Sequence, residues 1–220
     1  MLKGKKLSIL GDSVSTYRGV SNDRNANHTI WGNRCYYDDP FPKEKTYWYL
    51  VMQEFGMELC VNNSWSGGNL SGRDIEAAGV NRVNYLSRDD GADPDFIIVF
   101  MGLNDLGRMV DIDIFASDYE RTLLTIKEKH PNADVCCINM PNRTPAVKER
   151  TILFNEVIAN EVKAAGNKFF VCDLFSSRLC NDDYYNNTLD GLHPDEDGMR
   201  IIAEIVENAI TNKLKTPSNT

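Results

Sequence analysis

The sequence predicts an α/β protein in which a five-stranded parallel sheet lies between two layers of helices, as a three-layer α/β/α sandwich. Short apolar runs typical of buried strands alternate with longer segments whose apolar residues recur at helical spacing. Connections between parallel strands are almost always right-handed, which lays the intervening helices over the sheet. The length of 220 residues fits a single domain over residues 1–220, with a polar tail from about residue 213.

Each predicted strand is a short apolar run that ends on small or polar residues. The clearest run is 96–101, an unbroken aromatic and β-branched stretch of the kind found in strands covered on both faces. The five predicted strands are residues 6–10, 57–61, 96–101, 135–138 and 169–172.

The predicted helices follow from apolar stripes and from the residues that end them. The stripe over residues 44–55 is closed by Gly56, and a second one that begins near Phe115 is stopped by Pro131. Residues 70–86 are also predicted as a helix, although Gly72 and Gly79 weaken it. The last two predicted helices are one that contains Phe154 and ends at Gly166, and one over residues 195–212.

The charge of the chain excludes some classes of partner. The net charge of −8 provides no basic surplus to neutralise phosphates, so neither nucleic acid nor an anionic membrane is an expected partner. No stretch approaches the roughly 18 apolar residues of a membrane span. The apolar run after the basic start is too short for the core of a signal peptide. A cytoplasmic protein is expected, unless an export signal was removed before this numbering begins.

Metal and cofactor chemistry is not expected. The six cysteines have no C-x-x-C spacing, and four lie within apolar strand-like runs, which indicates buried reduced thiols. With three histidines, a histidine-rich metal site is not expected either.

Polar residues gather where the predicted strands end. Ser13 follows the first strand, Gly67 lies in the turn after the second, and Asn104 follows the third. Asp190 and His193 directly precede the last helix. Because parallel strands present their carboxyl ends at one edge, we expect these four clusters to meet in one crevice.

These residues are the parts needed for acyl transfer. A serine hydroxyl is a poor nucleophile without a neighbouring base, and His193 can be that base for Ser13. Asp190, three residues earlier, can hold the imidazole in the correct tautomer. The oxyanion of the tetrahedral intermediate needs preorganised donors, which the N–H groups of Ser13 and Gly67 and the side-chain amide of Asn104 could supply.

The same residues resemble the SGNH hydrolases, the superfamily of GDSL-type esterases, lipases and acylhydrolases. Its four sequence blocks are similar to residues 11–13, 61–67, 102–105 and 190–193. The resemblance implies a flavodoxin-like fold, Ser13 as the nucleophile, and Gly67 as an oxyanion donor, with Gly68 as the alternative. Val14 stands where the family usually has leucine, a conservative change.

Two other functions use the same residues. In a binding module on this fold, Ser13, Asn104 and His193 would only hydrogen-bond a ligand. In a metal-assisted hydrolase, Asp12, Asp105 and His193 would hold the ion. Asp12 and Asp105 are also the kind of residue that ties down a turn through backbone hydrogen bonds.

The long irregular segment over residues 14–42 bears on the substrate. Its aromatic rings are expected over or beside the crevice, with polar neighbours, as a wall that suits a sugar better than a long alkyl chain. These rings are Trp31, Tyr36, Tyr37 and Phe41. The alternative is that they form the small core of a long loop.

A small-molecule or saccharide ester, cleaved at a short acyl group, is the expected substrate. The family also includes lipases, lysophospholipases and thioesterases, which act on longer acyl chains. The sequence does not predict the oligomeric state.

Overall fold

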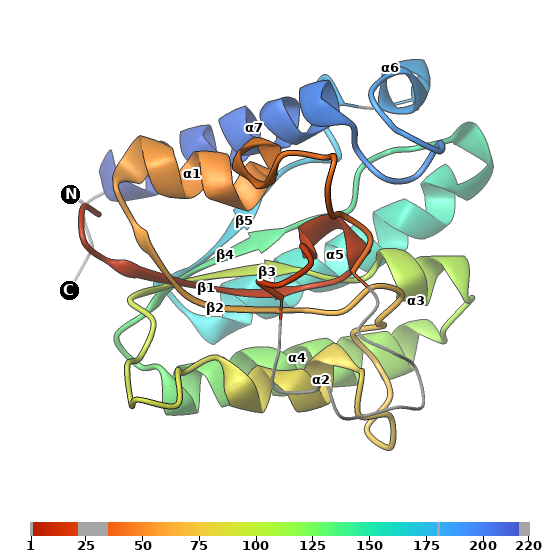
Figure 1. Cartoon of the computed structure of the whole chain (residues 1–220). Coiled ribbons are helices and arrows are strands. Elements are labelled where there is room, and N and C mark those ends of the chain that lie inside the picture. The colour runs from red at the N-terminus through yellow and green to blue at the C-terminus, as the bar shows by residue number, and fades with distance from the viewer. Residues whose placement is uncertain (1, 22–34, 180, 216–220) are drawn as a thin grey trace.

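A computed structural model of the chain describes residues 2–21, 35–179 and 181–215. Its centre is a five-stranded sheet in the order β2-β1-β3-β4-β5, with every neighbouring pair parallel (Figure 1). The strands are β1 (Lys6–Gly11), β2 (Glu58–Ser64), β3 (Phe96–Phe100), β4 (Asp134–Ile138) and β5 (Phe169–Cys172). The predicted five-stranded parallel α/β fold is confirmed.

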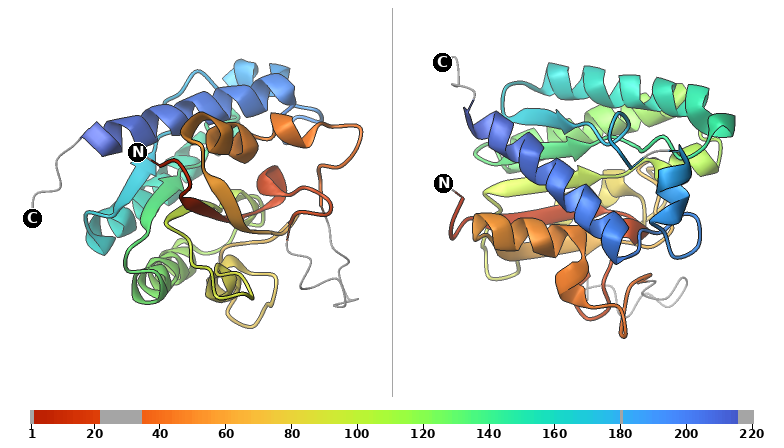
Figure 2. Two further views of the ribbon diagram at one scale, coloured as in Figure 1. Left: turned by 60° about the vertical axis from the view of Figure 1, so that its left-hand side comes forward. Right: turned by 90° about the horizontal axis from the view of Figure 1, so that it is seen from above.

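Helices cover both faces of the sheet. Helix α1 (Tyr47–Phe55) packs beside α7 (Glu196–Lys215) on one face, whereas α2 (Gly79–Arg82), α4 (Ile112–Lys129) and α5 (Lys148–Ala165) lie on the other (Figures 1 and 2). Two short helices, α3 (Leu103–Gly107) and α6 (Asn181–Asn186), lie beyond the carboxyl ends of the strands. Within the described ranges, none of the helices is long and apolar enough to cross a membrane.

The strand order creates a crevice at the carboxyl edge of the sheet. From β1 the chain passes to β2 on one side, and it then returns across β1 to β3 on the other side. The connections after β1 and β3 therefore leave in opposite directions, which opens a space between them. The carboxyl ends face the right-hand side of Figure 1, where α3 and α6 lie.

The central strands form the core. All five residues of β3 are buried, as its unbroken apolar run predicts, and so are residues 7–10 of β1. The thiols of Cys60, Cys136, Cys137 and Cys172 are free and buried, which agrees with the predicted reduced state.

Residues 70–86 differ from the predicted long helix. Only α2 and a 3-10 turn, Val83–Tyr85, are helical there. The backbone N–H groups of Leu70 and Ser71 donate to the carboxylate of Asp105, at 2.7 and 2.9 Å. Gly72 has a left-handed φ of +120°, and its N–H donates to Asp118. The side-chain amide of Asn81 donates to three carbonyls that a helix over residues 70–86 would pair with N–H groups four residues on, those of Gly72, Arg73 and Ile75.

Smaller differences concern the ends of elements. Strand β2 continues to Ser64 because Asn62, Asn63 and Ser64 pair with β1. Helix α1 begins at Tyr47, after a separate 3-10 turn over Lys43–Lys45. Helix α7 continues to Lys215, so the helix includes the first residues of the predicted polar tail. Helices α3 and α6 were not predicted.

Candidate active site

Ser13 stands on a tight turn at the end of β1. It begins a 3-10 turn, Ser13–Ser15, whose first carbonyl accepts from the N–H of Thr16. A side chain at Gly11 would place its Cβ 2.5 Å from the Cβ of Ser15, so the strand can turn this sharply only with glycine there. The carboxylate of Asp12 accepts from the N–H of Val14 at 3.1 Å. Asp12 thus caps the turn that presents Ser13, as expected for a turn residue.

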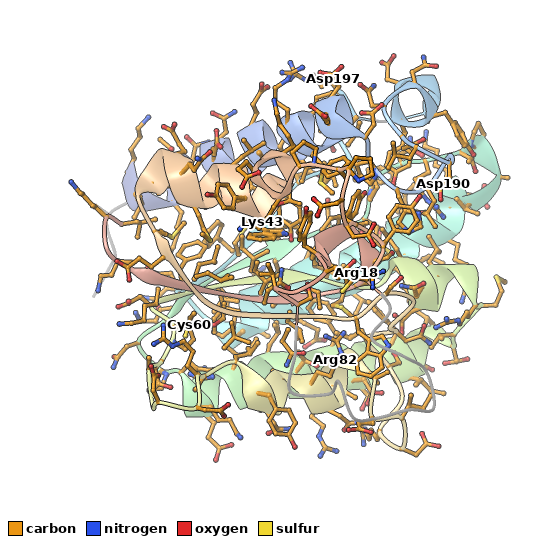
Figure 3. All side chains as sticks on the ribbon, viewed as in Figure 1. Arg18, Lys43, Cys60, Arg82, Asp190 and Asp197 are labelled. Carbon is orange, nitrogen blue, oxygen red and sulfur yellow. The ribbon has the colours of Figure 1, made fainter. Side chains whose placement is uncertain are left out.

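Ser13, His193 and Asp190 form a continuous hydrogen-bonded series. Nε2 of His193 lies 2.9 Å from Oγ of Ser13, although 180 residues separate them in the sequence. Nδ1 of His193 lies 2.8 Å from Oδ2 of Asp190. The other carboxylate oxygen of Asp190 accepts from the N–H groups of Leu192 and His193. Asp190, which Figure 3 labels on the segment between α6 and α7, therefore fixes the loop and the ring together.

Tyr36 contacts both members of the His193–Asp190 pair. Its ring stacks on the imidazole of His193, with 3.4 Å between ring centroids and 15° between ring planes. Its hydroxyl donates to Oδ2 of Asp190 at 2.8 Å. Tyr36 comes from the segment after residue 34, so a distant part of the chain holds the imidazole in place.

The surroundings keep Asp190 ionised and His193 neutral. Burial alone would raise the pKa of Asp190, but hydrogen bonds from His193, Tyr36 and the Leu192 N–H lower it well below its usual value. Burial lowers the pKa of His193, and the nearby carboxylate of Asp190 offsets only part of that shift. Near neutral pH, His193 is therefore a neutral imidazole that can accept a proton.

The backbone N–H groups of two predicted oxyanion donors have no described acceptor. Among the described residues, neither the Ser13 nor the Gly67 N–H has a hydrogen-bond acceptor. The N–H of Gly68, by contrast, donates to the carbonyl of Trp65 at 2.9 Å. Of the two adjacent glycines, Gly67 is thus the one whose donor is available.

The side-chain amide of Asn104 lies beside the same turn. Its Nδ2 donates to the carbonyl of Gly68 at 3.0 Å and lies 3.4 Å from Oδ2 of Asp12. Asn104 therefore joins the turn after β2 to the turn after β1. Burial raises the pKa of Asp12 to about 7, against the lowering effect of the Val14 N–H and of Arg82. Figure 3 labels Arg82 on α2.

Asp105 fixes the 65–71 loop, which contains Gly67, against helix α3, which carries Asn104. Its carboxylate accepts from Leu70 and Ser71 at the end of the 65–71 loop, and the residue is fully buried. This is the turn-fixing role that its residue type indicates. Within the part of the chain that the structure describes, no three histidine, cysteine or acidic side chains converge as a metal-ligand set.

Comparison with known families identifies the chain. A model of the GDSL-like lipase/acylhydrolase family matches residues 5–210. The chain belongs to the GDSL-like lipase/acylhydrolase family. The match confirms the resemblance drawn from the four sequence blocks. Comparison with curated protein sequences found no significant match.

Solved structures share the fold of this GDSL-like protein. A Bacteroides ovatus protein classed as a GDSL-like lipase is 20% identical, with a TM-score of 0.72, over 96% of this chain and 99% of that one. A family two carbohydrate esterase from Clostridium thermocellum is 17% identical, with a TM-score of 0.67, over 96% of this chain and 64% of that one. A psychrotrophic esterase from Pseudoalteromonas sp. is 16% identical, with a TM-score of 0.63, over 96% of this chain and 100% of that one. At these identities the likeness is one of fold.

The aromatic residues expected along the crevice of this GDSL-like protein occupy different environments. Trp31 lies outside the described residues. Tyr37 is only 1% exposed and donates to the carbonyl of Pro194 at 2.8 Å. Phe41 packs against Tyr37, with 4.8 Å between ring centroids. The burial of Tyr37 favours the alternative in which these rings hold the loop. Tyr36 stacks on the imidazole of His193, and Tyr37 meets the same imidazole edge-on with 6.5 Å between ring centroids.

A small hollow of about 180 Å³ opens beside Ser13. Its lining includes Asp12, Asn104, Leu103 and Leu192, together with Arg108 and Arg143, which sequence analysis did not single out. Arg143 lies in the loop after β4, at the same edge of the sheet as the other clusters. The rule that found Ser13 and Asn104, polar residues after a buried strand, also applies to this loop and could have found Arg143.

Proposed function

We propose that this GDSL-like protein is a serine ester hydrolase, with Ser13 as nucleophile, His193 as general base and Asp190 as the residue that orients the imidazole. One observation carries the proposal: the 2.9 Å and 2.8 Å contacts that link Ser13 to His193 and His193 to Asp190. Membership of the GDSL-like lipase/acylhydrolase family supports it. The buried, neutral imidazole is suited to the role of base.

The reaction divides into two acyl transfers. Oγ of Ser13 forms a bond with the ester carbonyl carbon as its proton passes to Nε2 of His193. The tetrahedral intermediate collapses, and the departing alcohol oxygen takes that proton. Water then attacks the acyl-enzyme and gives a proton to His193, which returns it to Ser13 as the carboxylic acid leaves. Asp190 remains ionised throughout and stabilises the imidazolium.

The proposed oxyanion hole consists of the N–H groups of Ser13 and Gly67 and the amide of Asn104. The two backbone donors have no described acceptor in the unliganded site. The Asn104 amide donates to the Gly68 carbonyl at 3.0 Å and, more weakly, to Oδ2 of Asp12 at 3.4 Å. The hydrogen on the longer contact with Asp12 is the one that would turn to the oxyanion.

Asn104→Ala is expected to lower kcat by roughly 10²–10³-fold with little change in KM, because an oxyanion donor acts mainly on the transition state. Steady-state kinetics on an aryl acetate measure both constants. Asn84→Ala is a matched control, since Asn84 lies on an exposed turn and its side chain bonds, among the described residues, the Asn81 carbonyl alone. A rise confined to KM would assign Asn104 to ground-state binding instead.

The size of the hollow supports a short acyl group. Pockets that take drug-sized ligands measure about 300–1,000 Å³, and the hollow beside Ser13, at about 180 Å³, is smaller. We therefore propose acetyl or similarly short esters of small molecules or saccharides as substrates. The fold shared with a carbohydrate esterase is compatible with a saccharide as the alcohol.

A chain-length series tests this function. Aryl acetates are expected to be cleaved about tenfold or more faster, by kcat/KM, than aryl octanoates, because the longer chain does not fit the hollow. Acetylated saccharides and an acetyl thioester extend the series, with released acetate as the readout. A preference for octanoyl or longer acyl chains would contradict the short-chain proposal and favour the lipase or thioesterase alternative. Absence of turnover with every ester would favour the binding-module alternative.

A further inference from the structure

Two arginines from different parts of the chain line the hollow beside Ser13. Arg143 follows β4, and Arg108 follows α3, and both line the same 180 Å³ space as Ser13 and Asn104. The chain as a whole is acidic, with 32 Asp and Glu residues against 24 Lys and Arg residues. The two positively charged guanidinium groups beside Ser13 therefore contrast with the negative net charge of the chain.

Arg143 has no described partner that explains its position. Its Nε is buried and makes no hydrogen bond to any described residue. Neither Arg143 nor Arg108 forms an ion pair within 4.0 Å with a described carboxylate. The positive charge of Arg143 nonetheless acts on His193 and Asp12, since it contributes to lowering the pKa of each.

Arg82 shows what a structural arginine looks like in this fold. Its guanidinium is fully buried and donates to the carbonyls of Gly11, Asn63 and Ala77. Arg82 thereby fastens the end of β1 to the end of β2. A buried guanidinium donor without an acceptor is costly, so Arg143 is better explained by an acceptor that a ligand brings.

Arg108 is held at the opening of the hollow. Its side chain is exposed, and Nη1 donates to the carbonyl of Gly67 at 2.8 Å and to the side chain of Asn69. These bonds hold the guanidinium group of Arg108 against the 65–71 loop. The other N–H groups of Arg108 have no acceptor among the described residues. Arg108 is thus anchored at the solvent-exposed side of the hollow.

We propose that Arg143, with Arg108 at the mouth, binds an anionic group of the substrate, a carboxylate or a phosphate carried near the scissile ester. Guanidinium groups match both anions through paired N–H donors. Asp12 also lines the hollow, but its pKa of about 7 means that it is partly protonated near neutral pH. The inference rests on the proposed ester hydrolysis and narrows its substrate class to acidic esters.

Three acetate esters that differ only in one substituent test the proposal. We would compare 3-acetoxybenzoate and 3-acetoxyphenyl phosphate with the neutral 3-acetoxybenzamide, and measure released acetate for each. Both anionic esters, or the one whose anion fits, are expected to have kcat/KM about 10- to 100-fold above the amide, as for a charge-assisted hydrogen bond. The kcat/KM values of the two anionic esters show whether the site prefers a carboxylate or a phosphate.

Arg143→Gln is expected to remove most of this preference, so that the anionic-to-neutral ratio of kcat/KM falls toward one. Arg143→Lys keeps the charge without the planar fork and should retain part of the ratio. Arg121→Gln is the matched control, because Arg121 is exposed on α4 and its loss changes the net charge equally. The control should keep the wild-type ratio. Thermal melts show whether each variant is folded.

A binding measurement separates this inference from the hydrolase proposal. Calorimetry on Ser13→Ala with benzoate, phenyl phosphate and benzamide needs no turnover, and at least one anion should bind more tightly than the amide. That difference should disappear in Ser13→Ala combined with Arg143→Gln. Hydrolysis of all three esters at one rate, with no anion preference in binding, would overturn the anion site and leave the hydrolase. Anion binding without turnover of any ester would overturn the hydrolase and leave the anion site.

Discussion

Ser13→Ala is expected to lower the kcat of ester hydrolysis by at least about 10⁴-fold, because no other described hydroxyl lies within hydrogen-bond distance of Nε2 of His193. Residual turnover would come from the oxyanion donors and binding alone. The variant should remain folded, since the Ser13 side chain is on a turn at the crevice and its loss removes one hydrogen bond. Single-turnover assays with an aryl acetate measure the loss.

A serine-directed phosphonate gives the same test a covalent readout. The wild-type chain should gain one adduct on the peptide that contains Ser13, also in the presence of a chelator, and Ser13→Ala should gain none. Ser176→Ala is the matched control, because Ser176 is exposed on the loop after β5 and its side chain lies outside the described site. Substantial turnover by purified Ser13→Ala would contradict the serine mechanism. Loss of activity to the chelator alone would favour the metal-assisted alternative.

The features that the sequence predicts well are those set by local pattern. The run over residues 96–101 has apolar side chains for both faces of a sheet, and β3 is indeed buried throughout. Polar residues directly after such runs can lie only at the carboxyl edge of a parallel sheet. The sequence therefore predicts that Ser13, Asn104 and His193 lie at one edge of the sheet. The contact between His193 and Ser13 depends further on the path of the chain between β5 and α7.

The features that the sequence does not predict depend on partners far along the chain. Residues 70–86 have helical spacing, yet the side-chain amide of Asn81 bonds the carbonyls of residues 72, 73 and 75 that a helix would use. The carboxylates of Asp105 and Asp118 hold the preceding N–H groups in a non-helical path. Tyr36 stacks on His193 across more than 150 residues of sequence, and no local pattern distinguishes that ring from Tyr37, which is buried. Tertiary contacts decide both cases, because they outweigh local propensity.

The same distinction applies to the oxyanion donors. The sequence block favours Gly67 and leaves Gly68 as the alternative, and the hydrogen bond from the Gly68 N–H to the Trp65 carbonyl supports Gly67 as the available donor. A turn of small polar residues shows that a donor is present, but the path of the backbone decides which N–H is free.

His193→Gln is expected to lower kcat by about 10⁴-fold or more, because the amide can bond Ser13 but cannot take its proton at neutral pH. Glutamine is preferred to alanine here, since it leaves a smaller gap beside Tyr36. His130→Gln is the matched control at the end of α4, where no contact with Ser13 exists. If His193→Gln kept more than a small fraction of the wild-type kcat, another residue would have to be the base.

The pH dependence of the wild-type enzyme tests the same assignment without a mutation. Only neutral imidazole accepts a proton, so kcat/KM should be constant above the pKa of His193 and fall as the pH drops through it. Burial places that pKa below the ordinary value of 6.5, and the acid limb should therefore have its midpoint below 6.5. Asp190→Asn removes the carboxylate that raises the pKa of His193, so its acid limb should move to still lower pH while the plateau falls. A profile independent of pH between about 5 and 8, or an acid limb that moves upward in Asp190→Asn, would be incompatible with His193 as the base.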